Sequence, residues 1–422
     1  MGETISSYIK FYTSVILKPY SWTVFELLSV ALLSTFFVWY IQFLWSRRKL
    51  YKCAKKMEGP LALPLIGCAL YFIGSPYDIY CNIMTMFNKY PKIFRVWFGP
   101  RLFCAVSEPK YFEILLPNFL RKEHLYHHAE CVVGYGLFTA PLDIWKRHRK
   151  IIMPTFNQKI LDSFVDIFSQ QANVLVEQLK TYSGKEEFDV FHVVYKCTLD
   201  IICETAMGVK VNTQTTDFPY PKWVDRIFEI VFLRIFVFWY HFDSIFNFTP
   251  LAKETTDLLK NLHEFSGVVN TKKKAFLDYL IELTSDENSK FTEQELREEV
   301  DTFIIAEKVY DELIEILGPD RSVEPADLPK LSYMDRFLKE TLRLFPVAPF
   351  IVRAIDEDVD LGDHIIPADT SVVFGILKAH TDEEYWPEPF KFDPDRFLPE
   401  EVAKRHPCAY VPFSYGSRNC IG

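Results

Sequence analysis

A long apolar stretch near the amino terminus constrains the fold of this chain more than any other feature. Residues 27–45 read LLSVALLSTFFVWYIQFLW and contain no charged side chain. A helix rises about 1.5 Å per residue, so a helix of this length crosses the roughly 30 Å hydrocarbon layer of a membrane. Trp22, Trp39 and Trp45 belong to the residue type that is enriched at membrane surfaces. We therefore predict a transmembrane anchor over residues 22–45.

The charged residues after this stretch predict on which side of the membrane the rest of the chain lies. Basic residues follow it at Arg47, Arg48, Lys49, Lys52, Lys55 and Lys56. The positive-inside rule places such a flank in the cytosol, so residues 1–21 are expected to be lumenal. A cleaved signal peptide fits poorly, because the apolar stretch is long, begins late and lacks a small-residue cleavage site. A buried core helix is the other alternative, and the length of the stretch disfavours it.

Composition excludes further classes of protein. Apolar residues make up 49% of the 422 residues and aromatic residues 16%, which indicates a large buried core. The net charge of −9 argues against nucleic acid as a partner. The nine cysteines are scattered without a Cys-x-x-Cys pair or zinc spacing, so we expect reduced thiols that face the cytosol or are buried.

Local patterns predict a mainly α-helical domain with a small β region. Residues 46–67 combine the basic flank with Pro60 and Pro64, and are expected to form a stiff hinge before a domain at residues 68–422. Two β-rich runs joined by Gly99 and Pro100 predict a hairpin. A helical pattern follows to about residue 318, and a second β-prone region covers residues 350–376.

One predicted helix is unusually long. It begins at a capping box formed by Thr292 and Glu295 and ends at Gly318. Its length of about 25 residues exceeds the 11–12 residues typical of globular proteins.

Residues 219–250 are crowded with aromatic side chains, which leave two interpretations open. The set is Trp223, Phe228, Phe232, Phe236, Phe238, Trp239, Tyr240 and Phe242. Most of these rings suit core packing. The alternative is an apolar surface that meets the membrane or admits an apolar substrate.

The carboxyl-terminal sequence FSYGSRNCIG holds a cysteine in a position suited to a tight loop. Gly416 and Gly422 flank Cys420, and glycine adopts the backbone angles that such a loop needs. Backbone N–H groups in a loop of this kind, or a bound metal, stabilise a thiolate. Arg418 is a cation that can bind a carboxylate. Taken alone, the pattern is equally compatible with a surface loop that holds a buried thiol.

Three further motifs place charged side chains where they could pair with each other or bind an acidic group. Glu340 and Arg343 share one helix face at i, i+3 spacing. Arg396 lies in a Pro-rich loop. Trp145 and Arg149 lie one helical turn apart, where an indole N–H and a guanidinium could together bind an acidic group.

Together these motifs resemble the cytochrome P-450 superfamily over nearly the whole chain. The haem signature F-x-x-G-x-R-x-C-x-G is matched by Phe413, Gly416, Arg418, Cys420 and Gly422. The E-x-x-R, arginine-loop and W-x-x-x-R motifs are matched by Glu340, Arg343, Arg396, Trp145 and Arg149. ICETAMG, VDTFIIA and RHRKIIMPTF are similar to the microsomal fourth family, which includes fatty-acid ω-hydroxylases and many insect enzymes.

The resemblance implies a haem b site. Cys420 would be the axial thiolate ligand of the haem iron, and Phe413 would pack beside it. The side chains implied to hold the haem propionates are Trp145, Arg149, Arg418 and Arg353.

A structural network is implied as well. Glu340, Arg343 and Arg396 would form a buried ionic network that locks the haem loop to the core.

The chain departs from the family pattern in two places. The run G-x-[D/E]-T-T, which serves oxygen binding and proton delivery, is absent, and Asp301 and Thr302 do not substitute for it. On this reading the long helix joins two family segments near Ala306 and Glu307. Ala306 stands where some fourth-family members carry a glutamate esterified to haem, so we expect non-covalent haem. The segments that follow the cysteine in the family are missing too, so the fold is expected to be incomplete.

The implied function is a haem-thiolate monooxygenase in the endoplasmic reticulum membrane, which uses O₂ to oxidise an apolar fatty acid, hormone or xenobiotic. No Gly-rich nucleotide fingerprint occurs, so electrons are expected from an NADPH–cytochrome reductase, with cytochrome b5 as an optional second donor. The basic residues Lys146, Arg147, Arg149 and Lys150 form either a docking face or a solvated helix face. The alternative function is an impaired or inactive family member that acts as a membrane-bound haem or lipid binder.

Overall fold

A computed structural model describes residues 23–90, 92–153, 161–184, 188, 190–207, 210–216, 219–270, 315–317, 321 and 323–421. The chain divides into two compact units, Met1–Lys55 and Lys56–Gly422. Of the predicted long helix from Thr292 to Gly318, only residues 315–317 are described, and they are helical. The junction near Ala306 and Glu307 lies outside the described residues, as do Trp22 and Gly422.

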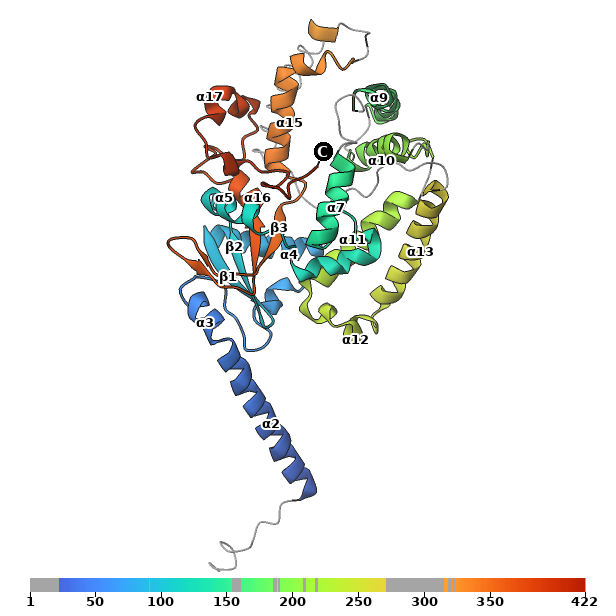
Figure 1. The fold of residues 1–422 in the computed structure, drawn as a ribbon. Coiled ribbons are helices and arrows are strands. Elements are labelled where there is room, and N and C mark those ends of the chain that lie inside the picture. Colours follow the sequence, from blue (N-terminus) through green and yellow to red (C-terminus); the bar gives the residue numbers. More distant parts are fainter. Residues whose placement is uncertain are drawn as a thin grey trace, which may run out of the picture. The chain divides into compact units, whose positions relative to one another are not determined.

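The first unit contains the predicted apolar helix. Helix α2, Val24–Ser46, begins at a capping box in which the Glu26 N–H donates to Thr23 Oγ1 at 3.3 Å (Figure 1). It buries no side chain within the protein, and its mean hydropathy is 1.9 over the most apolar window. By length and composition α2 is a candidate membrane span. The short basic helix α3, Arg48–Ala54, follows it.

A four-stranded sheet organises the second unit (Figure 1). Its strands are β1 Ile93–Phe98, β2 Arg101–Val106, β3 Phe350–Ile355 and β6 Thr370–Gly375, in the order β1-β2-β6-β3. The predicted hairpin is present, since β1 and β2 pair antiparallel around Gly99, whose φ is +56°. Strand β6 pairs parallel with β2 and antiparallel with β3, which joins the two predicted β regions. A second sheet pairs β4 Val359–Asp360 with β5 Ile365–Ile366.

Helices make up most of the described part of the second unit, which confirms the predicted fold class. The α-helices are α4 Pro76–Lys89, α5 Pro109–Asn118, α6 Glu130–Val133, α7 Leu142–Ile152, α9 Val165–Lys180, α10 Phe191–Met207, α11 Tyr220–Phe236, α12 Asp243–Phe246, α13 Pro250–Asn270, α15 Ser332–Leu344, α16 Ile376–His380 and α17 Pro399–Val402. The 3-10 helices are η1 Ala69–Phe72, η2 His124–Ala129, η4 Phe238–His241, η5 Leu328–Lys330, η6 Pro394–Phe397 and η7 Pro407–Ala409.

Each of the two interpretations of the aromatic-rich residues 219–250 holds for a different part of this segment. Helix α11 packs on α13 through Val224, Ile227 and Leu262, with Trp223 and Phe228 packed against them. By contrast, Phe242 is 49% exposed and Phe248 is 92% exposed. The helix therefore contributes to the core, whereas the segment after it presents apolar side chains to the surroundings.

The Pro-rich segment before the domain lies against β1. The Arg95 N–H donates to the Glu58 carbonyl at 2.8 Å, and Gly67 forms a bridge with Phe98. Gly67 has φ +61°, and a Cβ there would lie 2.3 Å from the Trp97 carbonyl oxygen. Glycine is therefore required where this segment approaches the strand.

Candidate functional site

The cysteine loop at the carboxyl-terminal end is closed by backbone hydrogen bonds. The Cys420 N–H donates to the Phe413 carbonyl at 3.0 Å, and the Asn419 N–H donates to the Gly416 carbonyl at 3.1 Å. Gly416 has φ +80°, and a Cβ there would lie 2.8 Å from Pro117 Cα at the end of α5. Only glycine permits this approach, so the loop conformation depends on the Gly-x-Arg-x-Cys spacing.

Cys420 differs from the buried cysteines in its surroundings. All nine cysteines are free, and Cys420 is partly exposed. Burial raises the pKa of Cys203 to about 12 and that of Cys408 to about 11, so both remain protonated thiols at neutral pH. Their protonation disfavours these thiols as metal ligands.

Helix α7 contributes an aromatic ring and a cation to the loop. Two guanidinium groups approach the buried Trp145 ring, with the Cζ of Arg149 at 5.5 Å and the Cζ of Arg418 at 4.9 Å from the ring centroid. Arg149 donates to the backbone carbonyl of Asn419 at 2.6 Å and to its side-chain oxygen at 2.9 Å. Arg149 thus binds the residue next to Cys420, and the carboxyl-terminal end lies beside α7 (Figure 1).

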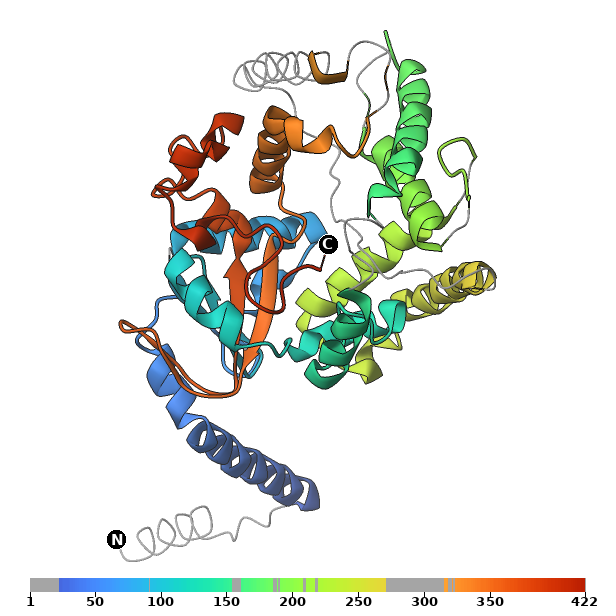
Figure 2. The ribbon, with the colours of Figure 1, turned by 45° about the horizontal axis from the view of Figure 1, so that its top comes forward.

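Two buried arginines, Arg353 and Arg418, lie close to each other near the cysteine loop. The carboxyl-terminal segment (dark red) lies beside β3 (orange), which carries Arg353 (Figure 2). Arg418 donates to the carbonyls of Leu120 and Ala140, but its Nε and that of Arg353 have no partner among the residues that the structure describes. Burial lowers the pKa of both, that of Arg418 to about 10, where the charge of Arg353 contributes as well.

A third cation, Lys122, joins them and was missed from the sequence. Its backbone forms a bridge with Arg353, and its ammonium group donates to the Phe138 carbonyl. Desolvation lowers the pKa of Lys122 well below its usual value, and repulsion by Arg353 and Arg418 lowers it further. The only sequence signal was a basic residue in an unremarkable Arg-Lys-Glu run, with no spacing relation to Cys420.

The cluster of Lys122, Arg353 and Arg418 fits an anionic group. Within the described residues, none of the three forms an ion pair with a carboxylate. Arg353 and Arg418 are buried, Lys122 is partly exposed, and the two arginines keep N–H groups without a partner among the described residues. Cations that repel one another in such surroundings are costly unless an anion compensates them. The two propionates of haem would supply that charge next to Cys420, so these residues fit haem b.

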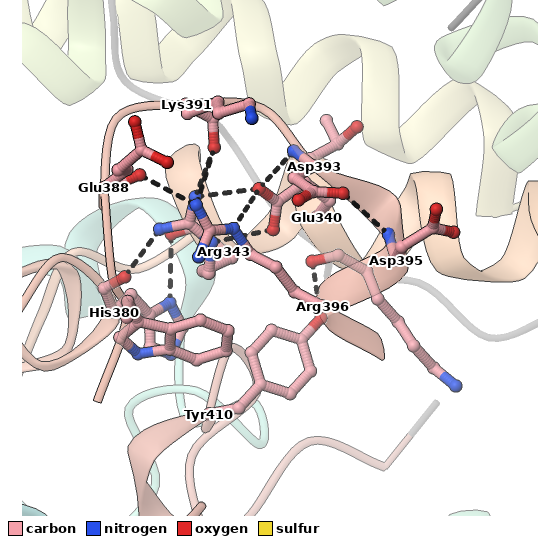
Figure 3. Close-up of polar contacts among 12 residues, drawn as sticks. Glu340, Arg343, His380, Glu388, Lys391, Asp393, Asp395, Arg396 and Tyr410 are labelled. Atoms are coloured by element: carbon pink, nitrogen blue, oxygen red, sulfur yellow. Dashed lines mark hydrogen bonds and ion pairs between the residues drawn. The ribbon is translucent and has the colours of Figure 1, made fainter. Parts of the chain in front are cut away.

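A buried ionic network lies between α15 and the Pro-rich loop. Glu340 and Arg343 are fully buried and joined at 2.7 and 2.8 Å (Figure 3). Glu340 also accepts from the Asp393 N–H at 2.8 Å and lies 3.5 Å from Arg396 Nε. The structure thus brings together the three residues expected to form this network, and adds the backbone of Asp393.

Arg343 extends the network through its remaining N–H groups. It donates to the His380 carbonyl at 2.9 Å and to the Lys391 carbonyl at 3.4 Å (Figure 3). Arg396 donates to the carbonyls of Pro387 and Glu388 at 2.6 and 2.8 Å. The two arginines therefore hold several loop carbonyls, which a simple surface ion pair would not do.

Of the remaining expected site residues, Phe413 contributes its carbonyl to the loop, as described above, and its side chain is 43% exposed. Gly422 lies outside the described residues.

Comparison with known proteins connects this geometry to a family. The cytochrome P450 family model matches residues 57–306 and 305–422. The chain is 33% identical to cytochrome P450 4V2 of Rattus norvegicus, covering 86% of this chain and 79% of that protein. It is 33% identical to cytochrome P450 4c3 of Drosophila melanogaster, covering 94% and 85%. It is 35% identical to cytochrome P450 4c21 of Blattella germanica, covering 87% and 83%.

Proposed function

The chain belongs to the cytochrome P450 family, whose members are monooxygenases that use haem b and O₂, and we propose that Cys420 is the residue that binds the haem iron. The observation that supports this best is the closed loop of Cys420 together with three cations that, in the described part of the chain, lack a carboxylate partner. Haem bound through a thiolate would activate O₂, so that one of its oxygen atoms is inserted into an apolar substrate.

The chain's own residues hold and orient this group. Arg353, Arg418 and Lys122 would bind the haem propionates, and the Trp145 ring packs near the guanidinium groups of Arg418 and Arg149. Arg149 keeps the cysteine loop against α7 through Asn419. Haem is retained by these contacts without a covalent bond.

Substrate and electron donor follow from the family and from the surface. Members of the family generally oxidise apolar molecules with electrons from NADPH–cytochrome P450 reductase. We infer that this chain oxidises a fatty acid, a hormone or a xenobiotic. On α7, the side chains of Lys146, Arg147 and Lys150 are exposed, which supports a docking face for the reductase or for cytochrome b5.

The location proposed is the endoplasmic reticulum membrane. Helix α2 supports an anchor there, because it is long, apolar and free of contacts that would bury it. The basic residues after it support a cytosolic domain at residues 68–422.

An impaired catalyst is the second candidate, and the comparisons favour it at one point. The family match breaks into two segments that meet at residues 305–306. The alignment with cytochrome P450 4c3 runs over 457 residues, which exceeds the 422 residues of the whole chain. The relative therefore carries internal residues that this chain lacks. Both observations support the absence of the acid–threonine run between Ala306 and Glu307.

A reduced carbon-monoxide spectrum of the full chain in detergent, with haem added, tests the proposed function. We expect a thiolate-type Soret band, and we expect acidified organic solvent to extract all the haem from the polypeptide. A chain that shows no such band with stoichiometric haem contradicts the assignment. Turnover with reductase and a fatty acid distinguishes an active from an impaired enzyme, because an impaired chain keeps the band and forms no product.

Lys122→Gln provides a second prediction, because the change should have opposite effects on the haem-free and haem-bound chains. Without haem, removing a cation that repels Arg353 and Arg418 leaves stability unchanged or higher. With haem, losing a charge-assisted contact of about 1.5–3 kcal/mol speeds haem loss by about ten- to a hundredfold. Haem transfer to an excess of a haem-scavenging protein measures the rate.

The neighbouring Arg121→Gln is the matched control, because Arg121 is 61% exposed and pairs with Asp356 at 3.8 Å. It should leave haem loss unchanged. Equal rates for Lys122→Gln and the unmodified chain would exclude Lys122 from the haem site.

A further inference from the structure

His380, at the end of α16, is a buried histidine that none of the recognised motifs includes. Its side chain is fully buried, and both ring nitrogens lie within hydrogen-bonding distance of backbone groups. Nδ1 lies 3.1 Å from the Arg343 carbonyl oxygen (Figure 3). Nε2 lies 2.9 Å from the Val411 nitrogen. The imidazole therefore lies between α15 and the chain that leads into the cysteine loop.

The two backbone partners determine the protonation state of the ring. A carbonyl oxygen only accepts, so Nδ1 must carry a proton and donate it to Arg343. A backbone N–H only donates, so Nε2 must be unprotonated to accept from Val411. Both hydrogen bonds exist together only in the neutral Nδ1–H tautomer, because an imidazolium would place two N–H groups opposite each other at Val411.

The surroundings of His380 favour this neutral form. Desolvation lowers the pKa of His380 to about 3, and the charge of Arg343 contributes in the same direction. Glu340 neutralises Arg343 on its far side, and Tyr410 stacks on the imidazole at 5.3 Å between ring centroids. The Tyr410 hydroxyl donates to the Lys339 carbonyl at 2.9 Å, so it leaves both imidazole nitrogens to the backbone.

The hydrogen bonds of His380 connect two parts of the candidate site. Its carbonyl accepts from Arg343, which holds Glu340, so the histidine is bound twice to the buried network. Val411 begins the loop, since its carbonyl accepts from the Ser414 N–H at 3.0 Å ahead of the Cys420–Phe413 closure. A displacement of α15 would thus be transmitted to the cysteine loop through the imidazole of His380.

We propose that His380 is a positioning residue, which as a neutral Nδ1–H imidazole holds the cysteine loop to the buried Glu340–Arg343 pair. The catalytic consequence rests on the proposed function, because it requires Cys420 to bind haem iron. The mechanical consequence does not, because the two hydrogen bonds exist in the haem-free chain.

Two substitutions separate the hydrogen bonds of the imidazole. In His380→Asn, the side-chain amide can replace the Nδ1 donor to Arg343 but is too short to reach Val411. In His380→Gln, the longer side chain can place its carbonyl oxygen near the former Nε2 position and accept from Val411, while the donor to Arg343 is lost. Both changes replace a neutral group with a neutral group of similar polarity, so neither leaves a buried charge.

Hydrogen exchange of the full chain in detergent, read by mass spectrometry on peptides that cover residues 407–419, measures the outcome. We expect His380→Asn to speed exchange of this loop about three- to tenfold, and His380→Gln to leave it close to that of the unmodified chain. Peptides from the β1–β2 hairpin should exchange equally in all three proteins, which shows that the fold is intact. Equal loop exchange in the Asn and Gln variants would overturn the proposal.

The carbon-monoxide spectrum of the haem-loaded chain provides a second measurement. On warming, the thiolate-type band of His380→Asn should be lost faster than that of His380→Gln, because the loop that carries Cys420 is held less firmly. If no variant and no unmodified chain shows a thiolate-type band, the proposed function fails, while loop exchange still decides on His380. If the band is present and exchange is equal, the positioning role fails and the proposed function stands.

Discussion

Replacing Cys420 with alanine should abolish the thiolate-type Soret band of the reduced carbon-monoxide complex. The loop around this residue is closed by the Cys420 N–H bond to Phe413, which an alanine keeps. The cations that we propose to bind the haem carboxylates are unchanged, so the variant should still take up haem. The lost ligand therefore appears as a change of spectral type with retained haem content, which an absorbance spectrum and a pyridine haemochrome measurement distinguish.

Cys408→Ala is the matched control, because Cys408 lies in the same carboxyl-terminal segment and is fully buried. Burial keeps it a protonated thiol, so it is not a ligand, and its removal costs only the packing of one sulfur. The thiolate-type band should persist in this variant. A band that survives in Cys420→Ala and disappears in Cys408→Ala would reverse the ligand assignment.

Much of the fold could be predicted because the relevant signals are local. The β1–β2 hairpin follows from two β-rich runs joined by Gly99 and Pro100, and α2 follows from an uninterrupted apolar stretch. Glu340 and Arg343 lie one helical turn apart, so helix geometry alone brings them together. The need for glycine at position 416 is a local signal as well, because its positive φ belongs to the turn that the loop makes there.

The parts of the site that escaped prediction depend on contacts between distant segments. Lys122 matters because Arg353 and Arg418 come close to it, and no periodicity in the sequence reports that proximity. The role of His380 depends on its hydrogen bonds to Arg343, which precedes it in the sequence, and to Val411, which follows it. Hydrophobic patterns predict which face of an element is buried, but they carry no information about which polar group it meets there.

Glu340→Gln should destabilise the chain strongly. It removes the charge that compensates Arg343 but keeps an oxygen that can accept from the Asp393 N–H. Because both partners are fully buried, we expect a loss of about 3–5 kcal/mol from the free energy of unfolding. That is a large share of the 5–15 kcal/mol typical of a folded domain, so haem uptake should fall as well. Urea unfolding followed by tryptophan fluorescence measures the change.

Two comparisons isolate the cause. Glu177→Gln breaks a pair of the same i, i+3 spacing, Glu177 with Lys180, in which both side chains are at least 65% exposed. It should cost at most about 1 kcal/mol. The charge-reversed double variant Glu340→Arg with Arg343→Glu restores an ion pair but should not restore stability, since a carboxylate cannot donate to the carbonyls of His380 and Lys391. A reversed pair as stable as the original would mean that charge pairing alone, without the carbonyl contacts, stabilises this region.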